Sequence, residues 1–106
     1  MTAHLIVMYP EPKDAHAFER AYREVHLPFA GPRLVGATGV VSKRVAAAPG
    51  ARAPYHAMSD VTFPSLAALQ ACAESKGGKE ALANAASIST GGPPTVLIVI
   101  DDFATS

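Results

Sequence analysis

The chain has 106 residues, of which 49% are hydrophobic and 17% are charged, and its formal net charge at pH 7 is zero. This length predicts one domain, residues 1–106. The Lys and Arg residues are scattered and form no basic stripe, so we expect no binding of nucleic acid. Cys72 is the only cysteine, which excludes an intramolecular disulfide and is typical of a protein in a reducing cytoplasm.

Apolar segments of the sequence are too short for membrane insertion or export. No segment approaches the roughly 20 apolar residues of a membrane-spanning helix, so we expect no association with a membrane. The first four residues lack a basic region, and the apolar run Leu5–Tyr9 is too short for the core of a signal peptide. We therefore expect a cytoplasmic protein.

The first third of the sequence predicts a strand followed by a helix. The apolar run Leu5–Tyr9 ends at Pro10 and is typical of a strand that is buried on both faces. Asp14 is a suitable N-cap for a helix over about residues 15–26, whose apolar stripe is Ala15, Phe18, Tyr22 and Val25. Pro28 is expected to end this helix because it lacks a backbone N–H. On the opposite side, the four-residue spacing favours ion pairs between Glu19 and Arg23 and between Arg20 and Glu24.

The remainder predicts two strands, a second helical region and a last strand. Apolar residues predict strands over about residues 37–45 and 55–63, joined by a flexible connection. Ser65 is a suitable cap for a helix that Gly77-Gly78 is expected to stop, and residues 79–86 predict a further short helix. After a break at residues 91–94, residues 95–103 predict the last strand. This order predicts an α+β, ferredoxin-like βαββαβ fold, with a four-stranded antiparallel sheet and helices on one face.

The first and last predicted strands are apolar at odd and even positions alike. Two main helices can cover only one face of a four-stranded sheet, so the other face would expose a large apolar patch, which monomeric proteins avoid. A second copy of the same sheet is the simplest cover for that patch. We therefore expect a homodimer with its two sheets packed face to face.

Several segments coincide with one known family. An apolar strand is followed by a helix that ends in the element Tyr22-x-x-x-His26-x-Pro28. Residues 63–70 (FPSLAALQ) and the Gly91-Gly92 break before a Val-Leu-Ile-rich strand continue the pattern. Over nearly its whole length the chain resembles the EthD family, which is named for its association with the degradation of ethyl tert-butyl ether. The resemblance implies a dimeric α+β barrel.

The chain departs from the family pattern at two positions. Many family members carry Asp where Asn84 stands here, and an aromatic residue where Ile88 stands. If that Asp accepts a proton in relatives, this chain lacks the group. Proteins of the same fold include lactone isomerases, polyketide-modifying monooxygenases and cyclases, and haem-degrading enzymes, and the fold alone does not choose among these reactions.

Tyr22 and His26 are the candidate catalytic residues. They lie one helical turn apart, and an imidazole with an ordinary pKa of ~6.5 is suited to moving a proton at neutral pH. The family pattern favours this role as well. In the structural alternative, His26 interacts with the dipole at the C-terminal end of the helix and Tyr22 belongs to the core.

Phe18, His56 and Met58 are the candidate ligand-binding residues. Phe18 shares the apolar stripe with Tyr22, and His56 and Met58 share one face of the third strand. If His56 does not bind ligand, it lies in the dimer interface or forms hydrogen bonds at the surface.

The remaining candidate groups predict no site. His4 and His16 are expected to be exposed, and Cys72 is expected to be a small buried thiol. No local cluster has the spacing of metal ligands, and the glycine pairs lack the context of phosphate-binding loops. We therefore expect no metal and no cofactor.

Two functions fit these features. As an enzyme, the protein would bind a small hydrophobic oxygenated organic compound of a catabolic pathway and isomerise, cyclise or oxygenate it without a cofactor. His26 would be the general acid/base, and Tyr22 would orient it or donate to a substrate oxygen. As a binding or accessory protein, it would use the same pocket without chemistry. An altered pKa of His26 in a dry cavity favours the enzyme, and a solvated His26 at a capped helix end favours the binding protein.

Overall fold

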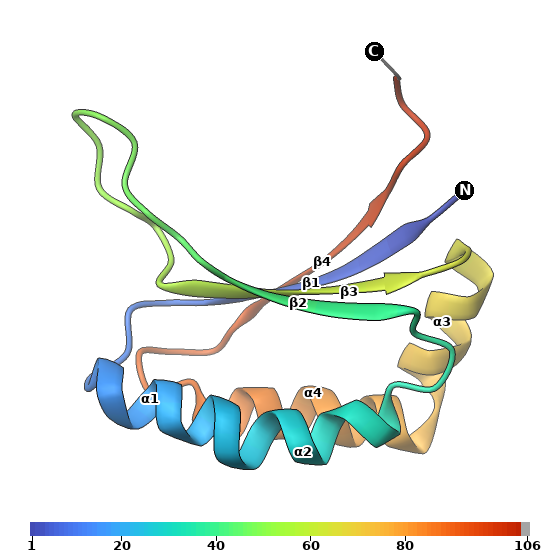
Figure 1. Cartoon of the computed structure of the whole chain (residues 1–106), viewed down its shortest axis with the longest axis horizontal. Helices are drawn as coiled ribbons and strands as arrows, with labels where there is room; N and C mark the ends of the chain where they lie inside the picture. The colour runs from blue at the N-terminus through green and yellow to red at the C-terminus, as the bar shows by residue number, and fades with distance from the viewer. Residues whose placement is uncertain (105–106) are drawn as a thin grey trace.

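The computed structural model of the protein describes residues 1–104. A single antiparallel sheet forms one layer of the structure (Figure 1). Its strands lie in the order β2-β3-β1-β4, and each pairs antiparallel with its neighbours. The strands are β1 (Ala3–Tyr9), β2 (Gly39–Arg44), β3 (Ala57–Phe63) and β4 (Thr95–Ile100). This arrangement confirms the predicted ferredoxin-like α+β fold.

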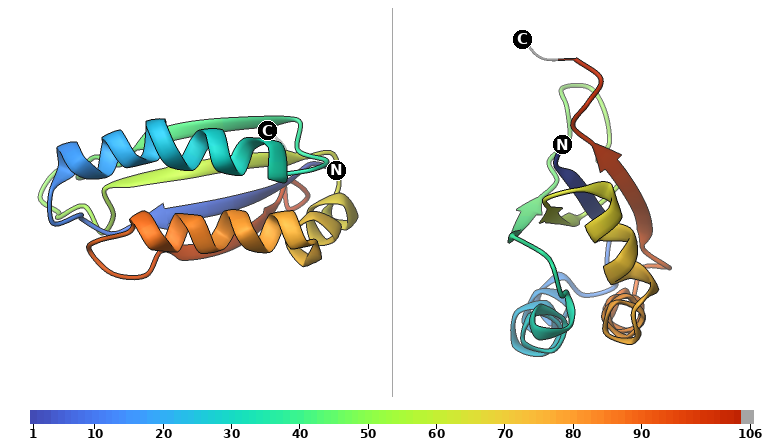
Figure 2. Two further views of the ribbon diagram at one scale, coloured as in Figure 1. Left: turned by 90° about the horizontal axis from the view of Figure 1, so that it is seen from below. Right: turned by 90° about the vertical axis from the view of Figure 1, so that its right-hand side faces the viewer.

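Helices cover one face of this sheet (Figure 2). The first helical segment runs continuously through α1 (Ala15–Ala21), a π-helical turn η1 (Tyr22–His26), α2 (Leu27–Ala30) and a 3-10 turn η2 (Gly31–Arg33). The second region is α3 (Leu66–Glu74) followed by α4 (Lys76–Ile88). Figure 2 shows α4 running alongside the first segment, with both beneath the strands.

Strand alternation places the core between sheet and helices. On β1, Leu5, Val7 and Tyr9 are buried, and Val61 and Phe63 on β3 share their face. Tyr9, Phe63 and Leu69 are the largest fully buried side chains of the described residues. This core fixes the inward register of β1 and β3, since a shift by one residue would expose every one of these side chains.

Pro28 does not end the first helix, so this prediction was wrong. The turn before it is π-helical, and the Leu27 N–H donates to the carbonyl of Tyr22, five residues earlier. Pro28 occupies the first turn of α2, where its missing N–H costs least. The wider turn thus lets the chain pass a proline without a break, and π turns of this kind occur often at functional sites.

The second helical region also divides at a different residue than expected. Ser75, rather than Gly77-Gly78, separates α3 from α4, and its side-chain oxygen caps α4 by accepting from the Gly78 N–H. Gly78 lies in the first turn of α4, where the backbone of α3 approaches closely. A Cβ at this position would stand 1.9 Å from the carbonyl oxygen of Cys72. Glycine is therefore required here for close approach of the backbone rather than as a helix breaker.

Gly78→Ala is expected to lower the free energy of unfolding by about 2 kcal/mol, because the added methyl group must push two backbone segments apart. Gly31→Ala is the matched control, since no atom from outside its own helical segment and chain neighbours lies within 4 Å of the position of its Cβ. The control should change stability by less than about 1 kcal/mol. Urea denaturation of both variants measures the difference, and equal midpoints would contradict the close approach.

The other face of the sheet carries no helix, and we call it the open face. Its apolar side chains include Val41, Leu97 and Val99, which are 53%, 44% and 43% exposed. No helix of the described residues is long and apolar enough to cross a membrane.

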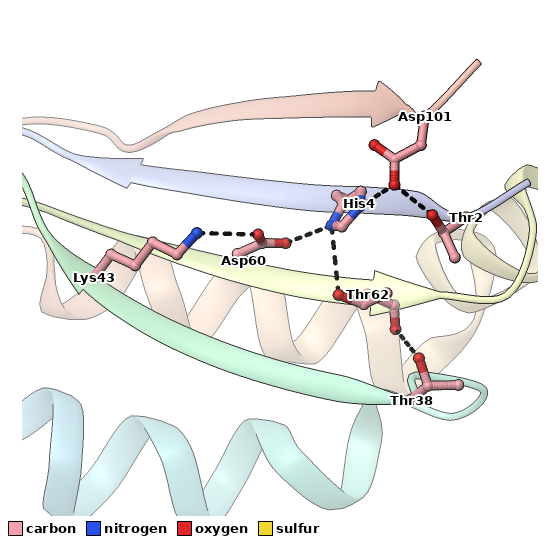
Figure 3. A network of polar contacts seen from close by, with 7 residues as sticks. All are labelled: Thr2, His4, Thr38, Lys43, Asp60, Thr62 and Asp101. Atoms are coloured by element: carbon pink, nitrogen blue, oxygen red, sulfur yellow. Dashed lines mark hydrogen bonds and ion pairs between the residues drawn. The ribbon is translucent and has the colours of Figure 1, made fainter. Parts of the chain in front are cut away.

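A polar network lies on the open face beside these residues (Figure 3), and it corrects the expectation that His4 is exposed. His4 is partly buried, with Nδ1 2.8 Å from Asp60 and Nε2 2.8 Å from Asp101. These two carboxylates, Asp101 first, raise the pKa of His4 above its ordinary value. Lys43 lies 3.6 Å from the second oxygen of Asp60, and His16 is exposed as predicted.

Candidate functional site

A cavity of about 280 Å³ lies between the sheet and the helices α2 and α4. Apolar side chains from β1, β2, β3, α2 and α4 form most of its wall, and no Asp, Glu, Lys or Arg lines it. The polar side chains in the wall are those of His26, Ser42 and Ser59. An apolar cavity with a few convergent polar groups is the usual form of a small-molecule site.

His26 enters this wall from the end of the π-helical turn. It is only 7% exposed, and its Nδ1 lies 2.9 Å from Oδ1 of Asn84 on α4. Burial lowers the pKa of His26 below its ordinary value, and the hydrogen bond to Asn84 opposes this shift. Because Oδ1 can only accept, Nδ1 carries the proton in the neutral ring, and Nε2 is left with a free lone pair. In this neutral state, Nε2 of His26 can accept a proton.

Three hydroxyl groups form a second polar feature of the site. The Tyr22 hydroxyl lies 2.6 Å from Oγ of Ser42 on β2 and 2.7 Å from Oγ of Ser59 on β3. Each group has one proton, so the two bonds use two of the three protons. When the Tyr22 hydroxyl donates one of these two bonds, the third proton belongs to one of the serines, and both serines line the cavity. The trio can therefore donate one hydrogen bond to an oxygen atom inside the cavity.

Tyr22→Phe is expected to lower the free energy of unfolding by about 1–3 kcal/mol, because it leaves the two serine hydroxyls without their shared partner. Tyr55→Phe is the matched control, since its hydroxyl makes one bond of 3.0 Å to Thr95 at a half-buried place. The control should cost less than the first variant. Thermal unfolding compares the two, and a larger loss from Tyr55→Phe would contradict the role of the trio.

A second cavity of about 310 Å³ adjoins the first, because Leu27 and Ser42 line both. Tyr22 lines this second cavity rather than the first, and its ring centroid lies 5.5 Å from that of His26. Unlike the first cavity, the second has charged residues in its wall, namely Glu19, Arg23, Lys43 and Arg44. Tyr22 and Ser42 thus stand where the two cavities meet.

The structure divides the candidate ligand-binding residues between two places. Phe18 and Met58 line the second cavity. His56 lines neither cavity; its Nε2 lies 3.0 Å from Glu19, and its ring packs edge-on against Phe18. Sequence reasoning named no role for Ser42 or Ser59. A signal was present, since both interrupt the apolar alternation on the helix-facing side of their strands.

Other candidate groups lie apart from these cavities. Within residues 1–104, the buried Tyr9 hydroxyl makes no hydrogen bond of 3.5 Å or less. Burial raises the pKa of this phenol above its ordinary range, and the nearby Ser59 hydroxyl opposes the shift. Cys72 is buried as expected, and burial raises the pKa of its thiol, which opposes reactivity. Within the described residues, no three His, Cys, Asp or Glu side chains are grouped so that they could hold a metal ion.

Solved structures with the same fold extend over nearly the whole chain. An ethyl tert-butyl ether d (EthD) family protein of Bacillus halodurans is 23% identical, with a TM-score of 0.83, and the match covers 95% of this chain and 99% of that one. An EthD-like protein of Ralstonia eutropha is 24% identical, with a TM-score of 0.72 and coverage of 99% and 96%. A dimeric ferredoxin-like protein of unknown function from Jannaschia is 21% identical, with a TM-score of 0.67 and coverage of 94% and 99%. At these identities the likeness shows the fold alone.

Sequence comparison gives the family. No curated protein matches the chain. The sequence model of the EthD domain matches residues 10–86, which is more than half of the chain and includes Tyr22, His26, Pro28 and Asn84. The match confirms the resemblance seen in the residues themselves, and the chain belongs to the EthD family.

Proposed function

We propose that the protein binds a small hydrophobic oxygenated compound in the first cavity and transforms it without a cofactor, with His26 as the general base. One observation carries this proposal: a buried neutral imidazole stands in the wall of an apolar cavity, with Nδ1 held by Asn84. The hydroxyl trio supports it, because it supplies the one kind of group that an oxygenated ligand needs from an otherwise apolar wall.

The substrate that suits these groups is enolisable, which means that it has a C–H bond next to a carbonyl group. Nε2 of His26 takes the proton from that carbon, and the electron pair of the C–H bond moves toward the carbonyl oxygen. The free serine proton of the trio donates to this oxygen, where negative charge develops. Return of the proton from His26 to another carbon completes an isomerisation. In a cyclisation, the enolate carbon instead forms a bond to a second carbonyl carbon of the same molecule, and the alkoxide formed there takes the proton back from His26. No metal or cofactor takes part in either sequence.

Binding without chemistry is the second candidate, and Asn84 favours it. An Asp beside Nδ1 would stabilise the imidazolium that forms when His26 takes a proton, whereas an amide carries no charge with which to do so. In this alternative, the same cavity holds the ligand, and His26 and the trio only fix its orientation.

Native mass spectrometry of the purified protein tests the proposal common to both candidates. We expect a noncovalent adduct of a small organic compound that is lost on denaturation and is weakened in His26→Ala. Protein without an adduct would then be titrated with small ketones and lactones. Failure to bind any of these compounds would contradict a ligand site in the cavity.

We also propose that the protein is a cytoplasmic homodimer in which the open faces of two sheets pack together. The exposed side chains of Val41, Leu97 and Val99 support this arrangement, since monomers avoid apolar patches of this kind. The Jannaschia protein with the same fold is described as dimeric. A cytoplasmic place is supported by the free thiol of Cys72.

A further inference from the structure

The second cavity differs from the first in its charge. Three cationic residues and one carboxylate line it, whereas no such residue lines the first cavity. Two of the three cations are already paired. Arg44 contacts both carboxylate oxygens of Glu19, at 2.6 and 3.2 Å, and Lys43 lies 3.6 Å from Asp60.

Arg23 is the remaining cation. Its expected partner four residues earlier, Glu19, pairs instead with Arg44 and His56, so that prediction was wrong. These contacts lower the pKa of Glu19 to about 2, which keeps it ionised and committed to them. The π-helical turn that begins at Tyr22 also alters the register between Glu19 and Arg23. Within residues 1–104, no carboxylate lies within ion-pair distance of Arg23.

We infer that Arg23 makes the second cavity a subsite for the carboxylate of an amphipathic ligand. The inference rests on the proposed function and names the class of its ligand: an apolar, oxygenated body in the first cavity and a carboxylate in the second. The two parts of such a molecule meet at Leu27 and Ser42, the residues that both cavities share. Guanidinium presents paired N–H donors that match the two oxygens of a carboxylate. Among the acidic groups of residues 1–104, none pairs with Arg23 and would compete with the ligand for it.

Decanoate and decanol form a matched pair of probes, because they share the apolar chain and differ in the charged end. We expect Arg23→Gln to weaken binding of decanoate by about fivefold, the upper range for an exposed ion pair. Binding of decanol should remain unchanged, and Arg23→Lys should restore much of the lost affinity for decanoate. Raising the ionic strength to about 1 M should remove most of the effect of Arg23→Gln, since charges are then screened within about 3 Å. Isothermal titration calorimetry measures each affinity.

Arg20→Gln is the control variant, because Arg20 is exposed on the same helical segment and lines neither cavity. It should bind both probes as the wild type does. If Arg23→Gln weakens both probes equally, or neither, the carboxylate subsite is overturned while binding in the first cavity stands. If Arg20→Gln weakens decanoate as much as Arg23→Gln does, the effect is one of general charge and the subsite is likewise overturned. If the wild type binds small ketones or lactones but neither probe, the subsite is overturned and the proposed function stands; if it binds none of these compounds, both fail.

Discussion

Leu97→Asp is expected to convert the protein from a dimer to a monomer. Leu97 is 44% exposed on β4 and pairs with Ile6 of β1, so its side chain lies on the open face. In a face-to-face dimer the new carboxylate would be buried against apolar residues of the second copy. Burying an unpaired charge costs about 3 kcal/mol or more, which raises the dissociation constant about a hundredfold. Sedimentation velocity at micromolar concentration measures the change.

Val25→Asp is the control for this experiment. Val25 is 53% exposed, but it lies in the π-helical turn on the helix side of the sheet. Adding the same charge there should leave the dimer intact. A compact wild-type monomer at micromolar concentration would contradict the proposed dimer outright, and dissociation by Val25→Asp instead of Leu97→Asp would move the interface to the helices.

The features that the sequence predicted well depend on neighbouring residues. Asp14 and Ser65 were expected to cap helices, and each side chain accepts a hydrogen bond from a backbone N–H three residues later. The order of the strands followed from short apolar runs between turn residues. The two-sided apolarity of β1 and β4 likewise predicted an uncovered face, and the structure exposes apolar residues of β4 there. These features can be recognised in the sequence because they do not depend on contacts between residues far apart in the chain.

The predictions that failed depend on contacts that the residue pattern does not signal. Pro28 was expected to stop a helix, yet a π-helical turn carries the chain past it. Gly77-Gly78 looked like a breaker because the close approach of Cys72 to Gly78 has no local signal. His4 looked exposed because Asp60 and Asp101 lie far from it in sequence.

The sequence predicted two residues of the candidate site but not the residues that contact them. His26 and Tyr22 were singled out from their spacing and from the family pattern. Spacing along one helix could not reveal the hydrogen-bond partners of these two residues, because Asn84 lies on α4, Ser42 on β2 and Ser59 on β3. Asn84 is one of the two departures from the family pattern, and the structure shows that this residue contacts the ring of His26.

His26→Ala is expected to slow proton abstraction in the cavity by about a hundredfold or more, the usual contribution of a general base. Nitrobenzisoxazole is a suitable model substrate, because removal of one C–H proton breaks its N–O bond and releases a coloured nitrophenolate. The reaction needs a base and, at the leaving oxygen, a hydrogen-bond donor, which are the two features that His26 and the hydroxyl trio supply. The product is followed by its absorbance.

His26→Gln is the control for the fold, because its amide is polar and close in size to imidazole. Both variants should keep the sedimentation behaviour and the helical circular dichroism of the wild type. If His26→Ala unfolds the protein, His26→Gln carries the test. A folded His26→Gln variant that releases nitrophenolate as fast as the wild type would exclude His26 as the base.

The pH dependence gives a signature that a merely structural role would not produce. Burial lowers the pKa of His26, so the base stays unprotonated until the pH falls below the ordinary value of ~6.5. The rate should therefore be level above this value and fall with a midpoint below it. In the same range the unfolded chain takes up a proton at His26 before the folded one does, so the contribution of His26 to stability should decrease as the pH falls. His4, whose pKa is raised in the folded protein, contributes with the opposite sign, so the His26 contribution is measured as the difference between the wild type and His26→Gln. Asn84→Asp places a negative charge beside Nδ1, which favours the imidazolium and should move the midpoint of the rate to higher pH. An unchanged midpoint in Asn84→Asp would show that the titrating base is not His26.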